Sequence, residues 1–173
     1  MKRIARVLTA ALAAASVLAF SGCSVRAQTA FTVNGSITTV AQVNDTVNGC
    51  ATAFGQAPSA LSATSVASAM IVGQISRDIA QAQNTQTSDA DLTSMIQNGQ
   101  INGLTPDMLQ DPVCANLAVG MALQALLAFQ MGTAPFLAAA QSYTVVPNPR
   151  FGAWNTSNLA LTGSGSLSQP AGS

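Results

Sequence analysis

The sequence contains no histidine and no glutamate, and its single lysine is Lys2. Histidine is the most frequent general base in enzymes and the commonest metal ligand, and lysine is the usual amine nucleophile. Without glutamate, aspartate is the only side-chain carboxylate. Charged residues of all kinds make up only 7% of the chain. These absences argue against an enzyme, and we expect neither a cofactor nor a metal site.

The first 22 residues have the layout of a secretory signal. Residues 1–6 are short and basic, and residues 7–20 form an uninterrupted run of apolar and small side chains. The run is too short for a transmembrane helix, which needs about 20 apolar residues. Ser21 and Gly22 follow, and Cys23 comes directly after them. Small residues before a cysteine let a peptidase cut there, and the thiol is a nucleophile that can accept a lipid.

The segment Leu18-Ala19-Phe20-Ser21-Gly22-Cys23 resembles the lipobox of bacterial lipoproteins, with Phe20 where leucine is usual. The resemblance implies cleavage before Cys23, attachment of lipid (palmitate among its chains) to the thiol, and a position on the extracytoplasmic face of the cell membrane. The alternative is an ordinary signal peptide cut near Ala27, which would discard Cys23.

Removal of the signal changes both the charge and the cysteine count. Three arginines (Arg26, Arg77 and Arg150) then stand against six aspartates, a balance of −3 that does not suit nucleic-acid binding. A lipid on Cys23 leaves two cysteines, Cys50 and Cys114. In an exported protein these can form a disulfide, which would close a loop of about 65 residues and stabilise the fold by about 4 kcal/mol. The alternative is two buried free thiols.

Apolar periodicity and end signals predict several helices. Apolar residues recur every three or four positions from Ile37 to Phe54, with Thr38 as the natural N-cap. A second helix is expected over residues 62–84, with Arg77 and Asp78 toward solvent. Ser88 begins a short third helix whose first turn carries two acids, Asp89 and Asp91. These acids are two positions apart and point in different directions, so they are interpreted as helix-start charges and not as a catalytic pair.

The longest apolar stretch is residues 113–131, preceded by the start signals Thr105-Pro106 and Asp111-Pro112. A buried core helix is favoured over a membrane segment, because its polar residues are costly in lipid. Those residues are Asn116, Gln124 and Gln130. A last helical turn is expected over residues 136–141.

Strand candidates lie near each end of the domain, at residues 31–33 and 142–146. Lone strands must satisfy their backbone groups, so we expect the two to pair with each other. The predicted fold is therefore mainly α: a bundle of about four to five helices closed by a short two-stranded pairing of N- and C-terminal strands. The predicted organisation is a signal peptide (1–22), a tether (23–30), the helical domain (31–157) and a disordered Gly/Ser-rich tail (158–173).

Two short motifs at the ends of the domain resemble known proteins. Phe31-Thr32-Val33-Asn34-Gly35-Ser36-Ile37-Thr38 resembles the opening of SurA-type chaperone domains, in which a strand runs through Asn-Gly into the first helix. Asn148-Pro149-Arg150-Phe151-Gly152-Ala153-Trp154 resembles the ending of actinobacterial lipoproteins with a SurA-like N-terminal domain, with Phe151 in place of the usual tyrosine. The resemblance implies a helical, chaperone-like peptide-binding domain. The parvulin-type isomerase domain that often follows in the family has no counterpart before the chain ends, so isomerase activity is not expected.

Three further features have two interpretations each. Five methionines of the domain fill the core, or they form an adaptable binding surface; they are Met70, Met95, Met108, Met121 and Met131. Arg150 bonds helix-end carbonyls or an aspartate, or it contacts a ligand. Phe151 and Trp154 are expected to cover the end of the core. A redox role for the two cysteines is less favoured than a structural bridge, because they are not in a Cys-x-x-Cys arrangement.

These observations favour a membrane-anchored lipoprotein with a non-catalytic, chaperone-like domain that binds peptides or unfolded envelope proteins. The alternative is a structural lipoprotein that holds one specific envelope partner. An enzyme would need a pocket lined by aspartate and Tyr143, and this is the least favoured of the three hypotheses.

Overall fold

The computed structural model describes residues 28–163. The predicted signal peptide, Cys23, most of the predicted tether and the last ten residues lie outside this range. Five α-helices and two small antiparallel sheets make up the described part, which confirms the predicted mainly-α bundle with short strand pairing. In chain order the main elements are β1 (Thr29–Val33), β2 (Ser36–Thr39), α2 (Val40–Ala53), α3 (Ala63–Ala82), α4 (Asp89–Gln97), α5 (Pro112–Met131), α6 (Thr133–Gln141), β3 (Val145–Pro147), β4 (Ala153–Asn155) and β5 (Ala160–Thr162).

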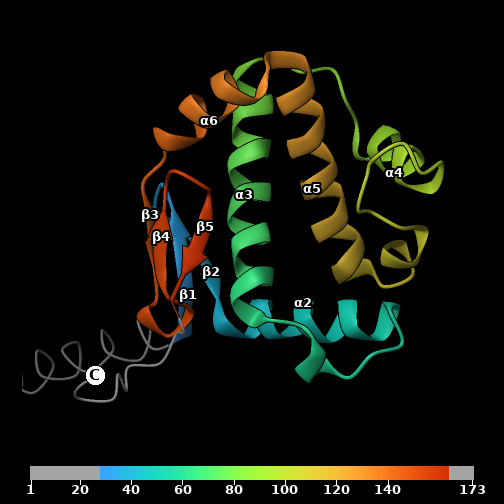
Figure 1. Ribbon diagram of the computed structural model, residues 1–173, viewed down its shortest axis with the longest axis vertical. Helices are drawn as coiled ribbons and strands as arrows, with labels where there is room; N and C mark the ends of the chain where they lie inside the picture. Colours follow the sequence, from blue (N-terminus) through green and yellow to red (C-terminus); the bar gives the residue numbers. More distant parts are fainter. Residues whose placement is uncertain (1–27, 164–173) are drawn as a thin grey trace, which may run out of the picture.

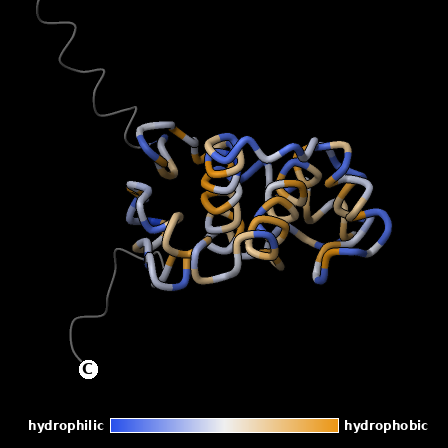
Figure 2. Tube along the Cα trace, turned by 90° about the horizontal axis from the view of Figure 1, so that it is seen from above, coloured by the Kyte–Doolittle hydropathy of each residue, from blue (hydrophilic) through white to orange (hydrophobic). Residues whose placement is uncertain are grey.

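Helices α3 and α5 lie side by side at the centre and run in the same direction (Figure 1). Their ends meet where Gln83 Nε2 donates to Met131 Sδ at 3.3 Å. Midway they cross at two glycines, and a Cβ placed on Gly120 would lie 3.2 Å from Gly73 Cα. Because neither residue has a side chain, the two backbones approach closely. Viewed from above, hydrophobic residues are most frequent on these central helices and hydrophilic ones on the surrounding loops (Figure 2).

Helix α5 is long and apolar enough to cross a membrane by length and composition, the one such helix within residues 28–163. It contacts α2, α3, α4 and α6. Seven of its residues are buried, and four of them are alanine, glycine or cysteine, which lets neighbouring helices pack closely; the seven are Cys114, Ala118, Val119, Gly120, Ala122, Leu123 and Leu127. This packing supports the interpretation as a core helix.

Helix α2 crosses the base of the central pair and is bonded to α5 (Figure 1). Cys50 and Cys114 form the predicted disulfide, with Cα atoms 4.8 Å apart. Beside it, Asp111 caps α5: its Oδ1 accepts from Val113 N at 2.9 Å and Cys114 N at 3.0 Å. The Asp111 carboxylate occupies the space in which a side chain on Gly49 would lie.

Residues 29–39 form a hairpin that corrects the prediction for the start of the first helix. Asn34 and Gly35 make its turn, with φ of 47° and 84°. Residues 36–39 are strand β2, so the N-cap of the helix is Thr39 and not Thr38, and Gln42 completes a capping box with it. Ile37 was expected on the buried helix face, but it is 55% exposed. The Asn-Gly turn favours a two-residue hairpin, and that preference outweighs the helical spacing of residues 37–43.

Strand β3 adds to the other side of β1, which gives the sheet order β2-β1-β3. The predicted pairing of N- and C-terminal strands is therefore present: Phe31 lies opposite Pro147, and Val33 opposite Val145. Asn34 N also donates to Thr144 O at 2.9 Å. The sheet has three strands and not two because the segment expected to start the helix forms β2.

The second sheet shows that order extends beyond residue 157. Strand β5 pairs with β4, Trp154 opposite Leu161, and its Leu161 N donates to Ser68 Oγ of α3 at 2.9 Å. The predicted disordered tail is thus wrong for residues 158–163, and the tether prediction is wrong for Thr29 and Ala30, which belong to β1. Leu159 and Leu161 are buried, and their burial against the helices outweighs the flexibility of a Gly/Ser-rich segment.

Candidate functional site

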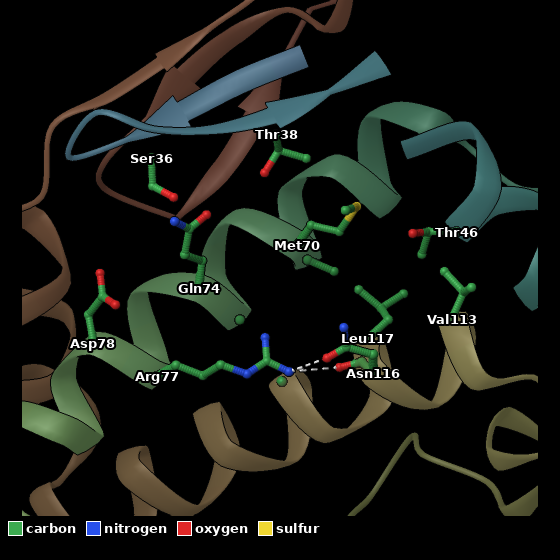
Figure 3. Close-up of a pocket in the computed structure, with 13 residues that line it drawn as sticks. Ser36, Thr38, Thr46, Met70, Gln74, Arg77, Asp78, Val113, Asn116 and Leu117 are labelled. Atoms are coloured by element: carbon green, nitrogen blue, oxygen red, sulfur yellow. Dashed lines mark hydrogen bonds between the residues drawn. The ribbon is translucent and has the colours of Figure 1, made fainter. Parts of the chain in front are cut away.

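A groove lies where β2, α2, α3 and α5 meet, and we refer to it as the β2 groove (Figure 3). Its volume is about 280 Å³. It is lined by Ser36 and Thr38 of β2, Thr46 of α2, Ala69, Met70, Gly73, Gln74, Arg77 and Asp78 of α3, and Val113, Asn116, Leu117 and Gly120 of α5. This volume is at the lower end of the range for ligand sites, so it suits one or two side chains of a longer molecule.

The β2 wall of the groove is the edge strand of the three-stranded sheet. Val33 and Ser36 flank the two-residue turn, so they form a hydrogen-bonded pair and the next pair, Thr32 and Ile37, does not. The N–H and C=O of Ile37 therefore point away from β1. In Figure 3 the Ser36 and Thr38 side chains point from the hairpin toward the groove. The wall thus presents two hydroxyls and one residue of unpaired backbone.

The helical walls are apolar near α2 and polar further along α3. Met70, Leu117 and Val113 come from α3 and α5 at the end nearer Thr46 (Figure 3). Val113 is 39% exposed, and Met70 is partly buried against the core. The backbone between them is bare at Gly73 and Gly120. Such a surface can accept an apolar side chain next to a hydrogen-bonding strand edge.

Arg77 and Asp78 supply the charge of the groove. Both are partly buried, which corrects the expectation that they face solvent. Arg77 Nη2 donates to the Asn116 carbonyl oxygen at 3.1 Å and also to Asn116 Oδ1. Burial, and after it the negative charge of Asp78, raise the pKa of the Tyr143 phenol above its usual value of 10.0.

The asparagines of the two sequence motifs, Asn34 and Asn148, meet at the sheet and do not line the β2 groove. Asn34 Oδ1 accepts from Thr144 N at 2.9 Å. Asn148 Nδ2 donates to Thr29 O at 2.8 Å, and Asn148 N donates to Ala30 O at 2.8 Å. The side-chain amides of Asn34 and Asn148 therefore tie the start of the domain to its end. Their role within residues 28–163 is structural.

For the other residues of the motif at 148–154, some predictions are confirmed and one is wrong. Phe151 is buried and Trp154 partly buried against the core, as expected. Gly152, with φ of 106°, lies so close to Thr162 O that a side chain would collide with it. Pro149 begins a 3₁₀ turn. The Arg150 side chain is exposed and makes no hydrogen bond or ion pair with any residue in 28–163, so neither predicted structural bond is present.

Other candidate residues have structural roles. Ser88 and Asp91 form the capping box of α4, and the Ser88 hydroxyl and N–H lower the Asp91 pKa. Met108 is buried, and the other four methionines are partly buried against the core, which favours the core-filling interpretation. Met121 also lines a second cavity of about 390 Å³ between α3, α5, α6 and the β4–β5 turn. Residues 28–163 contain no group of three potential metal ligands.

Comparison of the chain with protein-family models, curated proteins and solved structures found no match. The resemblance to SurA-type domains therefore rests on the two motifs alone. Sequence reasoning did not identify the groove, because Arg77, Asn116, Gly73 and Gly120 come from separate helices. One signal for it exists: paired glycines in the middle of two long apolar helices indicate a close crossing.

Proposed function

We propose that this protein is an extracytoplasmic lipoprotein, anchored to the cell membrane through Cys23, whose helical domain binds extended peptide segments without catalysis, as a chaperone does. The observation that carries the proposal is the β2 groove, where an edge strand with outward backbone groups lies beside Met70 and Leu117. A peptide in extended conformation can add to such an edge and place alternate side chains in the neighbouring groove.

Three features of the chain support the other parts of the proposal. The lipobox-like segment before Cys23 supports the anchor. The paired motifs at Asn34-Gly35 and Asn148-Pro149 support the chaperone-like class. The lack of histidine, glutamate and a cluster of titratable groups in the β2 groove supports binding without chemistry. Mass spectrometry of the mature protein tests the anchor: we expect a lipid on Cys23, and an unmodified chain starting after Ala27 would contradict it.

Substitution of Ile37 by proline tests the groove. The outward N–H of Ile37 is lost while the ladder bonds to β1 are kept, so the fold should survive. One net hydrogen bond is worth about 1 kcal/mol, so the dissociation constant for an extended peptide should rise by roughly two- to tenfold. Fluorescence anisotropy of a labelled peptide of alternating valine and threonine, with the mature protein in lipid nanodiscs, measures this change.

Ile37→Thr is the matched control, because it keeps the N–H and the β-branched shape. We expect it to bind the peptide like the unaltered protein, and empty nanodiscs give the background. Equal affinity of the Ile37→Pro and Ile37→Thr variants, with both folded by circular dichroism, would show that the strand edge is not the binding element.

One observation favours the alternative of a structural lipoprotein with a single envelope partner. Phe129, near the end of α5, is 87% exposed. Exposed aromatic residues often anchor protein–protein interfaces. Crosslinking in cells separates the two functions: many clients that compete for the groove support the first, and one dominant partner that is lost in Phe129→Ala supports the second.

A further inference from the structure

Arg77 is a cation of the β2 groove that has no anionic partner within residues 28–163. Its guanidinium has five N–H donors. Both hydrogen bonds that the side chain makes come from Nη2, and both are accepted by neutral oxygens of Asn116. Nε and Nη1 donate no hydrogen bond to any residue within 28–163. A partly buried guanidinium with unused donors is suited to an anionic ligand.

The guanidinium is held in one position over bare backbone. Asn116 fixes it from α5 by two acceptors, and its Nη1 lies 3.7 Å from the point where a Cβ on Gly120 would be. A Cβ at position 120 would be in ordinary van der Waals contact with the guanidinium. The glycine therefore leaves room beside Arg77 in the groove, and the bonds to Asn116 reduce the side-chain entropy that a ligand would otherwise have to remove.

The neighbouring acid does not neutralise Arg77. Asp78 follows it on α3 and lines the same groove, yet the two side chains make no ion pair, and in Figure 3 they point apart. Asp78 acts instead on Tyr143, whose pKa it helps to raise. The Arg77 end of the groove thus keeps its positive charge.

We propose that Arg77 binds a carboxylate of the peptide that occupies the β2 groove, through the unused Nε and Nη1 donors. This inference rests on the proposed function and adds the ligand's charge to it. Ser36 and Thr38 line the same groove as Arg77, so a segment that pairs with β2 passes within the site that holds the guanidinium. The carboxylate is either the C-terminus of the peptide or an acidic side chain within it.

Three fluorescein-labelled peptides of the same valine–threonine sequence separate these sources. One ends in a free carboxylate, one is amidated and contains a central glutamate, and one is amidated with glutamine at that place. With the mature protein in nanodiscs, we expect at least one carboxylate peptide to bind about tenfold more tightly than the neutral one, the size of one charge-assisted contact. The tighter of the two identifies the source.

Arg77→Gln should remove the preference for a carboxylate, since the charge-assisted contact is lost. Arg150→Gln is the matched control: it removes the other arginine of the described range, which is exposed and outside the groove. Because Arg77→Gln could loosen the contact with Asn116, the preference of the unaltered protein among the three peptides is an independent test.

The outcomes distinguish the two proposals. Equal binding of all three peptides by the unaltered protein overturns the carboxylate inference and leaves peptide binding in place. A preference that persists in Arg77→Gln also overturns it, whether or not Arg150→Gln removes that preference. Failure of every peptide to bind overturns the proposed function, and the inference with it.

Discussion

Helix α5 is contacted by two regions that are held in place by different means. On one side α2 is joined to it through Cys50–Cys114 and through the Asp111 cap that lies over Gly49. On another side α4 and the segment that follows it, up to residue 109, contact α5 without a covalent link. This α4 segment is held by apolar side chains: Leu92, Ile96, Ile101, Leu104 and Met108 are all buried.

The difference matters because α2, the region bonded to α5, lines the β2 groove together with β2, α3 and α5. No residue that lines it belongs to α4 or to the segment after it. Thr46 of α2 and Val113 of α5 lie near the disulfide in sequence and form one end of the groove. We therefore expect the disulfide to help keep the groove in shape, and the α4 segment to open by local unfolding without altering it.

The largest expected effect comes from removing the bond between α2 and α5. Replacing both Cys50 and Cys114 by alanine releases residues separated by 64 positions, which costs about 4 kcal/mol in the chain-entropy model. Guanidinium unfolding followed by circular dichroism measures the change. Dithiothreitol should shift the unaltered protein by a similar amount and the double variant not at all. A loss below about 1 kcal/mol would mean that packing alone keeps α2 on α5.

A smaller effect is expected from Leu92→Ala on the non-covalent side. Leu92 is 1% exposed, and truncation of a buried leucine costs about 3 kcal/mol. Because no bond ties α4 to α5, we expect the loss to appear as local opening. Hydrogen exchange should accelerate in residues 89–109 and stay unchanged in α2 and α3. Ser94→Ala, on the exposed face of α4, is the control. Equal acceleration in α2 and α4 would show one cooperative unit and remove the distinction.

Local signals in the sequence were sufficient to predict most helices and strands. Ser88 with Asp91, and Asp111 with Pro112, identified two helix starts correctly because capping depends on neighbouring residues only. The cysteine count, together with the expected export, predicted the disulfide correctly for a similar reason: few pairings were available. The prediction was wrong at Ile37 and Leu159, where strand pairing and burial against distant elements decide the conformation.

The groove itself could not be predicted from the sequence. Its charge depends on where Arg77 lies relative to Asn116, 39 positions away, and on the crossing at Gly73 and Gly120. Periodicity assigned Arg77 to the solvent face because it reports one helix at a time. A partly buried arginine between two helices needs the packing of both, and that packing depends on the whole core.

The smallest expected effects concern two helix caps, Asp111 beside the disulfide and Ser88 at the start of α4. Asp111→Ala removes the acceptor of Val113 N and Cys114 N and should cost about 1 kcal/mol, because the cap is partly buried beside the disulfide. Ser88→Ala removes the capping box of α4 on an exposed surface, and its effect should be smaller and confined to exchange of the first turn of α4.

The cap of α4 should also depend on pH, because Asp91 is part of it. The Asp91 pKa is lowered in the folded protein, mainly by the Ser88 hydroxyl and then by the Ser88 N–H, from a usual value of 3.8. A lowered folded-state pKa means that the carboxylate stabilises the fold fully above 3.8 and loses that contribution as the pH falls through the folded value. The difference in α4 exchange between the unaltered protein and Asp91→Asn, measured by mass spectrometry, should therefore shrink below that pH. An undiminished difference in acid would show that the α4 cap does not depend on the charge of Asp91, and that the two caps differ only in their surroundings.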